Sequence, residues 1–262
     1  IHIDSPYADT HVRWWKGNLH AHTSRSDGVL SPQEVVDTYA SQGYNFLMLS
    51  DHDQLTSSAD LETLDARGMV LIPGNEITQM GPHLLHVNAQ THIPPSRDRQ
   101  AVLDRIRDEG GFAILNHPNW LEEFDHCPKE RLAEWQGYAG IEVYNTVCRR
   151  AEGSAMATMK WDWLLSRGRR LWGYANDDSH ELIDYGGAWN MVQSVHCDRS
   201  SIIEALEKGR FYASTGVIIE RINVEDRSIT VATTNADRIA VYGNAGKRWA
   251  TVDEPEVTFQ VP

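Results

Sequence analysis

Two histidines occupy alternate positions near the start of the chain, and a carboxylate follows them. In the stretch KGNLHAHTSRSDG (16–28), His20 and His22 are one residue apart, and Asp27 comes five residues after His22. Alternate residues of a β-strand share one face, so both imidazole rings would point the same way. That arrangement suits ligands of a metal ion, although a histidine pair on a solvated strand edge would look the same.

Further acids and histidines stand at or near the ends of apolar runs. Six of these runs predict strands that are buried on both faces: NFLMLSDHD (45–53), MVLIPGNE (69–76), LLHVNA (84–89), GFAILNHP (111–118), GIEVYN (140–145) and RLWGYANDD (170–178). The polar residues concerned are His52, Glu76, His86, His117, Asp178 and His180. Active sites of α/β barrels and open sheets lie at the carboxyl ends of strands, so this placement favours one metal-dependent site. Turn formation or helix capping would explain any one acid alone.

The candidate ligands offer nitrogen and oxygen but no sulfur, which suits zinc, manganese or iron. The three cysteines, Cys127, Cys148 and Cys197, lie far apart and indicate neither a disulfide framework nor a zinc finger. Their sparse, odd number favours a reducing compartment, so we expect a cytoplasmic protein. No apolar run approaches the ~20 residues of a membrane span, and the net charge of −13 argues against binding extended nucleic acid.

Helix signals separate several of the apolar runs. The clearest is SPQEVVDTYASQG (31–43), which has a capping box at its start and a glycine at its end. The stretches 97–111 and 153–168 are similar, so we predict one α/β domain over 1–214, as a barrel or an open sheet. From there on the apolar residues alternate at period two, which predicts a small antiparallel β extension over 215–262.

Five motifs follow one another within residues 17–180: LHAHTSRSDG, SDHD, PGNE with HLLHVNA, NHP and DDSH. In type and order they resemble the PHP (polymerase and histidinol phosphatase) superfamily of metal-dependent phosphoesterases. The resemblance implies a distorted (β/α)7 barrel, here with a small C-terminal antiparallel β appendage. It also implies three divalent metal ions (manganese, zinc or iron) at the mouth of the barrel.

The resemblance implies a ligand set as well. The first ion would be held by His20, His22, Glu76 and Asp178, the second by Glu76, His86 and His117, and the third by Asp27, His52 and His180. His83 is the alternative to His86, because the two flank a pair of leucines and face opposite ways in a strand. His86 is preferred for its place in the strand body. The expected catalytic residues are Asp27, His52, Asp178 and His180.

The mechanism expected from this resemblance is hydrolysis of a small phosphorylated substrate, a monoester or a diester. A metal-bridging hydroxide would attack phosphorus in line while the ions neutralise charge on the phosphoryl oxygens. Arg25 is the first candidate for binding a phosphate oxygen, and Arg149 and Arg150 are second candidates. Asn116 and Asn145 end strands and would donate hydrogen bonds to the substrate. The other histidines are predicted to be surface or core residues, namely His2, His11, His92, His126 and His196.

Three other functions stay open. An amidohydrolase also opens with HxH on a barrel strand, but that family places a bridging lysine at a mid-barrel strand end and closes on a lone aspartate. This chain has Glu76 and a terminal DxH instead. A nuclease acting on nucleotide ends would fit the same ligands. A sensor without enzymatic activity would be expected to lack ligands, and none is obviously missing.

Overall fold

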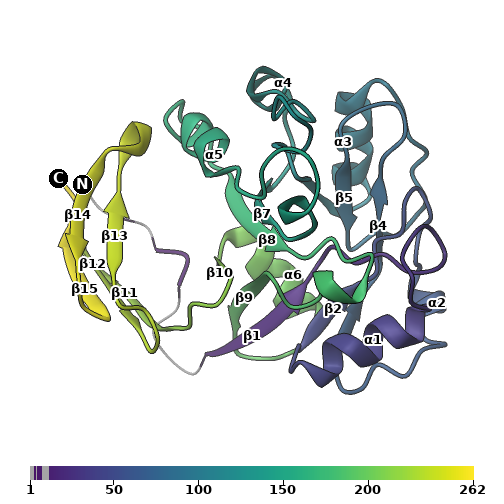
Figure 1. Cartoon of the computed structure of the whole chain (residues 1–262), viewed down its shortest axis with the longest axis horizontal. Coiled ribbons are helices and arrows are strands. Elements are labelled where there is room, and N and C mark those ends of the chain that lie inside the picture. The colour runs from purple at the N-terminus through teal and green to yellow at the C-terminus, as the bar shows by residue number, and fades with distance from the viewer. Residues whose placement is uncertain (1–2, 4, 8–11) are drawn as a thin grey trace.

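The computed structural model describes residues 3, 5–7 and 12–262, so the predictions for His2 and His11 lie outside the described residues. Figure 1 shows a main α/β part and, at the left, the strands that follow residue 214. The predicted α/β class is confirmed. No described helix is both long enough and apolar enough to cross a membrane.

Two five-stranded sheets build the main part. One has the order β10-β9-β1-β2-β3, from β1 (Arg13–Asn18), β2 (Phe46–Met48), β3 (Val70–Ile72), β9 (Trp189–Ser194) and β10 (Phe211–Ser214). The other has the order β4-β5-β6-β7-β8, from β4 (Gly74–Ile77), β5 (Leu84–Val87), β6 (Phe112–Leu115), β7 (Gly140–Asn145) and β8 (Trp172–Asn176). Two isolated bridges link the sheets: His52, after β2, pairs with Glu76 of β4, and Ala21, after β1, pairs with Ser179, after β8. Among the described strands no single closed barrel is formed.

One strand runs against the parallel pattern. β5 is antiparallel to both β4 and β6, whereas β6, β7 and β8 are parallel to one another. Leu84, the first residue of β5, therefore pairs with Leu115 at the carboxyl end of β6, while His86 pairs with Ala113 near its start. Residues that precede β5 consequently share the edge where the parallel strands end.

Helices cover the sheets, and the strands are buried on both faces as predicted. Along β6, Phe112 and Ile114 join one apolar cluster, while Ala113 and Leu115 join another that includes helical residues. The α-helices are α1 (Pro32–Ser41), α2 (Ser58–Leu61), α3 (Arg99–Asp108), α4 (Lys129–Glu134), α5 (Thr158–Leu165) and α6 (Arg199–Lys208). The predicted capping box of α1 is confirmed, whereas α5 begins later than the predicted stretch 153–168.

The C-terminal strands pair antiparallel among themselves. One sheet has the order β11-β12-β15, from β11 (Ile219–Glu225), β12 (Ser228–Thr233) and β15 (Glu256–Gln260). The other pairs β13 (Ile239–Tyr242) with β14 (Arg248–Val252). Short 3₁₀ turns complete the chain: η1 (Val147–Arg149), η2 (Leu182–Asp184) and η3 (Asn244–Gly246).

A buried arginine holds the loop between β4 and β5. Arg99, at the start of α3, is 1% exposed, and its guanidinium donates hydrogen bonds to five backbone carbonyl groups. The distances are 2.8 to 3.0 Å, and the acceptors belong to Thr78, Gln79, Gly81, Pro82 and Ser96. Five carbonyl dipoles thus surround one charge, which fixes the path of the chain from β4 into β5.

We expect Arg99→Met to lower the free energy of unfolding by at least about 3 kcal/mol, because several buried carbonyl groups would lose their donors. The exposed Arg105→Met in the same helix is the control, with a change below about 0.5 kcal/mol. Urea unfolding followed by circular dichroism measures both. Equal stabilities for the two variants would contradict this role of Arg99.

Candidate metal centre

A single buried carboxylate lies at the centre of the site. Glu76, on β4, has no exposed surface, and its two oxygens lie 2.8 to 3.5 Å from ring nitrogens of five histidines. These are His20, His22, His52, His83 and His117, which come from four separate stretches of the chain. An isolated ionised carboxylate is very unfavourable in a protein interior, so this one depends on its imidazole neighbours.

Asp178 lies beside Glu76 and completes the buried part of the site. Its Oδ1 is 3.0 Å from Nε2 of His20 and 3.0 Å from Nε2 of His22, and its Oδ2 is 3.8 Å from Nε2 of His117. The backbone of Asp178 has a φ of 56°, in the left-handed region that few residues other than glycine adopt. Such strain is concentrated at functional sites in proteins.

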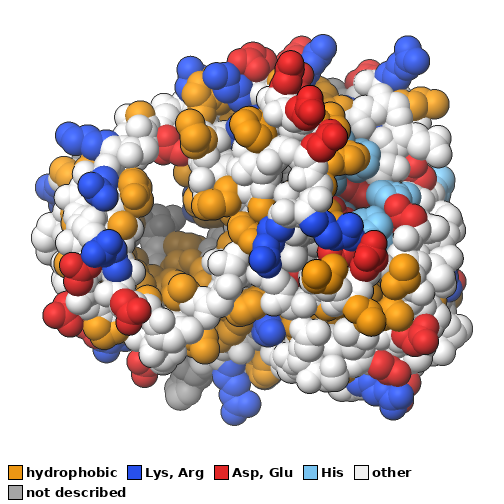
Figure 2. Space-filling model, viewed as in Figure 1, with side chains coloured by type: hydrophobic (Ala, Val, Ile, Leu, Met, Phe, Trp, Pro, Cys, Tyr) orange, Lys and Arg blue, Asp and Glu red, His pale blue; other side chains and the backbone are white. Residues whose placement is uncertain are grey.

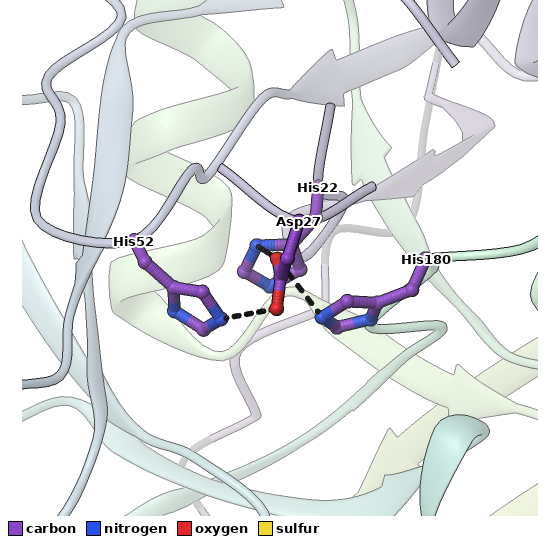
Figure 3. Close-up of side chains that lie close together, drawn as sticks. All are labelled: His22, Asp27, His52 and His180. Atoms are coloured by element: carbon purple, nitrogen blue, oxygen red, sulfur yellow. Dashed lines mark ion pairs between the residues drawn. The ribbon is translucent and has the colours of Figure 1, made fainter. Parts of the chain in front are cut away.

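A second group lies at the more exposed side of the centre (Figure 3). The carboxylate of Asp27 is 3.3 Å from Nε2 of His52, 3.3 Å from Nε2 of His180 and 3.7 Å from Nδ1 of His22. Nδ1 of His180 lies 2.7 Å from the carbonyl oxygen of Asp178. An Nδ1–H that donates to this carbonyl leaves the Nε2 lone pair facing Asp27.

Several of the converging atoms lack a hydrogen bond. Nε2 of His20 and His22, Nδ1 of His52 and His83, and Oε2 of Glu76 are buried and have no hydrogen-bond partner among the described residues. Buried polar atoms are nearly always hydrogen-bonded, so this set of lone pairs fits bound cations. Four groups bring three or more such ligand atoms within 4.8 Å of one another: His22–Asp27–His52–His180, His83–His117–His126, His20–His117–Asp178 and His20–His22–Glu76.

Eight of the nine predicted ligands therefore converge, whereas the structure places the ninth, His86, away from them. Its ring is buried and pairs with Glu109 instead of Glu76. His83, just before β5, takes the expected place, with Nδ1 3.2 Å from Oε1 of Glu76. The antiparallel direction of β5 is the reason, because its beginning lies at the edge where the parallel strands end.

The two asparagines predicted to bind substrate donate to carboxylates of the site. Nδ2 of Asn116 donates to Oε1 of Glu76 at 2.6 Å, and Nδ2 of Asn145 donates to Oδ2 of Asp178 at 3.2 Å. Both asparagines are buried, and neither lines the pocket above the centre. Their amide groups orient the acids of the site.

A pocket of about 370 Å³ opens above the centre, and Figure 2 shows histidines gathered with acidic and basic side chains in a hollow on this face. Of the three candidate arginines, only Arg150 lines the pocket. Its Nε and Nη2 each donate to Asp184 at 2.8 Å, which fixes the planar guanidinium in place. Arg25 lies 3.6 Å from Asp60 instead, and Arg149 is exposed outside the pocket.

His126, predicted to be a surface or core residue, also reaches the site. Its Nε2 accepts a hydrogen bond from the backbone N–H of His83 at 2.9 Å. Its ring centroid lies 4.7 Å from that of His117 and 5.0 Å from that of Trp120. Burial, followed by the charges of His117 and His83, lowers the pKa of His126 to about 2, so the ring is neutral. No motif marks this histidine, because a tertiary contact of its loop brings it here.

One solved structure shares the fold of the whole chain. It is a two-domain protein from Bacteroides vulgatus that contains a predicted PHP-like metal-dependent phosphoesterase, with a TM-score of 0.63 and 20% identity. The match covers 99% of this chain and 87% of that one. No family model matches the chain.

Relatives also align in sequence, and three of them are described below. An uncharacterised protein of Methanocaldococcus jannaschii is 24% identical over 70% of this chain and 73% of its own length. A 3′,5′-nucleoside bisphosphate phosphatase of Chromobacterium violaceum is 36% identical over 35% of this chain and 33% of that enzyme. A 5′-3′ exoribonuclease of Haemophilus influenzae is 40% identical over 28% of each chain. The solved structure shows a shared fold, and the alignments with the two named enzymes span a third or less of their lengths.

The metal-free protein should lose thermal stability as pH rises. Burial lowers the pKa of His52, but the neighbouring carboxylates of Asp27 and Glu76 outweigh this effect and raise that pKa from 6.5 to about 10. A histidine whose pKa is raised on folding stabilises the protein fully below its unfolded pKa, and this contribution is lost as pH rises through the folded value. The decline therefore falls between about pH 6.5 and pH 10, and it should be shallower in His52→Gln. The melting temperatures of both proteins, measured in chelator across this pH range, test the prediction. Parallel curves of melting temperature against pH would contradict it.

Proposed function

We propose that this chain, whose fold is that of a PHP-like phosphoesterase, is a metal-dependent hydrolase of small phosphate esters. The observation that carries the proposal is the carboxylate of Glu76, which lies 2.8 to 3.5 Å from five imidazole nitrogens. Divalent manganese, zinc or iron bound there would supply a nucleophile from water near neutral pH and neutralise charge on phosphoryl oxygens.

The ligand atoms divide into three sets. His20, His22, Glu76 and Asp178 would hold one ion, Glu76, His83 and His117 a second, and Asp27, His52 and His180 a third. The residues expected to be catalytic, Asp27, His52, Asp178 and His180, all line the pocket. In that position they would lie against the phosphoryl group of a bound ester.

The pocket wall supplies recognition of the substrate. Arg150, held flat by Asp184, would donate to an anionic oxygen of the ester. Trp120, which also lines the pocket, offers an apolar face to the organic part of the substrate. A pocket of about 370 Å³ suits a small phosphorylated molecule, in keeping with the bisphosphate phosphatase among the relatives.

Hydrolysis at nucleotide ends is the second candidate. The exoribonuclease relative supports it, and Trp120 would stack on a terminal base. The net charge of −13 still argues against a surface that binds extended nucleic acid. Amide hydrolysis of the amidohydrolase type is less well supported, because no lysine is found among the described residues that line the pocket.

Hydrolysis of chromogenic phosphate monoesters and diesters tests the proposal. The chelator-stripped protein receives manganese, zinc or iron singly, and we compare His83→Gln with the matched His86→Gln. The first should reduce kcat/KM at least about 100-fold, because it removes a ligand, and the second less than about 3-fold. No metal-dependent turnover of either ester by the wild-type protein would refute the proposed function. Equal losses in the two variants would refute the assignment of His83.

Arg150→Gln should raise KM for the preferred ester by roughly 10- to 100-fold, as expected for loss of a hydrogen bond from a charged donor. Arg149→Gln, next to it in sequence but outside the pocket, should leave KM unchanged. Steady-state kinetics of the metal-loaded proteins distinguish the two. A KM effect only in Arg149→Gln would place the anion elsewhere.

A further inference from the structure

Glu142 is a fully buried acid that the function described so far does not use. It lies in the middle of β7, is 1% exposed, and does not line the pocket. Its oxygens accept four hydrogen bonds of 2.8 to 2.9 Å. The donors are Nδ1 of His20, the backbone N–H of His117, and the side-chain amides of Asn145 and Asn176.

These contacts lead to three of the candidate ligands. Glu142 Oε1 meets the ring of His20 directly, and its Oε2 meets the backbone of His117. Its third donor, Asn145, also donates to Oδ2 of Asp178 at 3.2 Å. One carboxylate on β7 therefore links residues that follow β1, β6 and β8.

The local chemistry calls for a carboxylate at this position. Every neighbour is a donor, and an ionised carboxylate only accepts, with room for about four hydrogen bonds. A glutamine of the same shape would direct its own N–H groups at donors. No lysine or arginine is paired with Glu142 within the described part of the chain, and a buried acid without such a partner is unfavourable for stability alone.

We infer that Glu142 is a positioning residue for the candidate metal centre, an inference that rests on the proposed function. Its hydrogen bond keeps a proton on Nδ1 of His20, so that Nε2, 3.0 Å from Asp178, presents its lone pair to a cation. A carboxylate behind a ligating histidine sets the tautomer and the ring orientation, and its loss lowers metal affinity. Through His20, Glu142 bonds to the ligand set of His20, His22, Glu76 and Asp178, here called the His20 group. It has no hydrogen bond to Asp27, His52 or His180, the Asp27 group.

Titration of the chelator-stripped protein with zinc tests the inference by calorimetry. Glu142→Gln should weaken binding at the His20 group by about 10- to 100-fold and leave binding at the Asp27 group unchanged. Asp27→Asn should weaken zinc binding at the Asp27 group and leave binding at the His20 group unchanged. Asp177→Asn is the matched control, because Asp177 is equally buried and hydrogen-bonded but bonds to no candidate ligand side chain. Equal zinc affinity in wild-type protein and Glu142→Gln overturns the inference.

A second measurement needs no metal, and its deciding arm uses the wild-type protein alone. Nitrogen-15 NMR of the wild-type protein should show a slowly exchanging, hydrogen-bonded Nδ1–H on His20, and Glu142→Gln should lose it. Its absence in the wild-type protein overturns the inference. If zinc affinity depends on Glu142 but no ester is hydrolysed, the proposed function fails while the positioning role stands. If Glu142→Gln keeps the metal-dependent hydrolysis and the zinc affinity of the wild-type protein, the proposed function stands and the positioning role of Glu142 fails.

Discussion

The site depends on keeping the carboxylate of Glu76 ionised although it is buried. Burial raises its pKa, but His20, His83 and the other imidazoles outweigh this and hold that pKa well below the usual range. The same balance works in reverse for His20, where burial lowers the pKa and Asp178, Glu142 and Glu76 raise it well above 6.5. Neither set of groups would be stable in the interior alone. The strand ends that carry these acids and histidines must therefore lie close together in the folded protein.

Apolar packing brings those strand ends together, and polar groups adjust them. Strands such as β6 bury both faces, so their positions are set by the core on either side. Loops at the site are then fixed by cationic side chains that donate to backbone carbonyl groups. Arg99 does this for the loop before His83, and Lys160 does it for the loop that carries His126, with contacts of 2.5 to 2.9 Å.

Polar residues around the centre divide into those that would face a ligand and those that hold others in place. Asn116 and Asn145 stand at strand ends, as ligands do, yet their amides donate to Glu76 and Asp178. Arg150 is different, because Asp184 fixes it at the pocket wall, where it remains open to a substrate anion. The division follows from burial. Asn116 and Asn145 are buried beneath the carboxylates, whereas Arg150 is exposed at the pocket wall.

The sequence by itself determined the α/β class, the capped first helix and the kinds of groups at the strand ends. It did so because residue type, spacing and burial pattern are local properties. Only the tertiary structure decided that His83 and not His86 meets Glu76, because the direction of β5 depends on its partners. The same holds for the contact of His126 with His83 and that of Glu142 with His20, because each joins residues far apart in the sequence. A lone acid in the apolar run 140–145 was a signal for Glu142, but its four donors come together only in the folded chain.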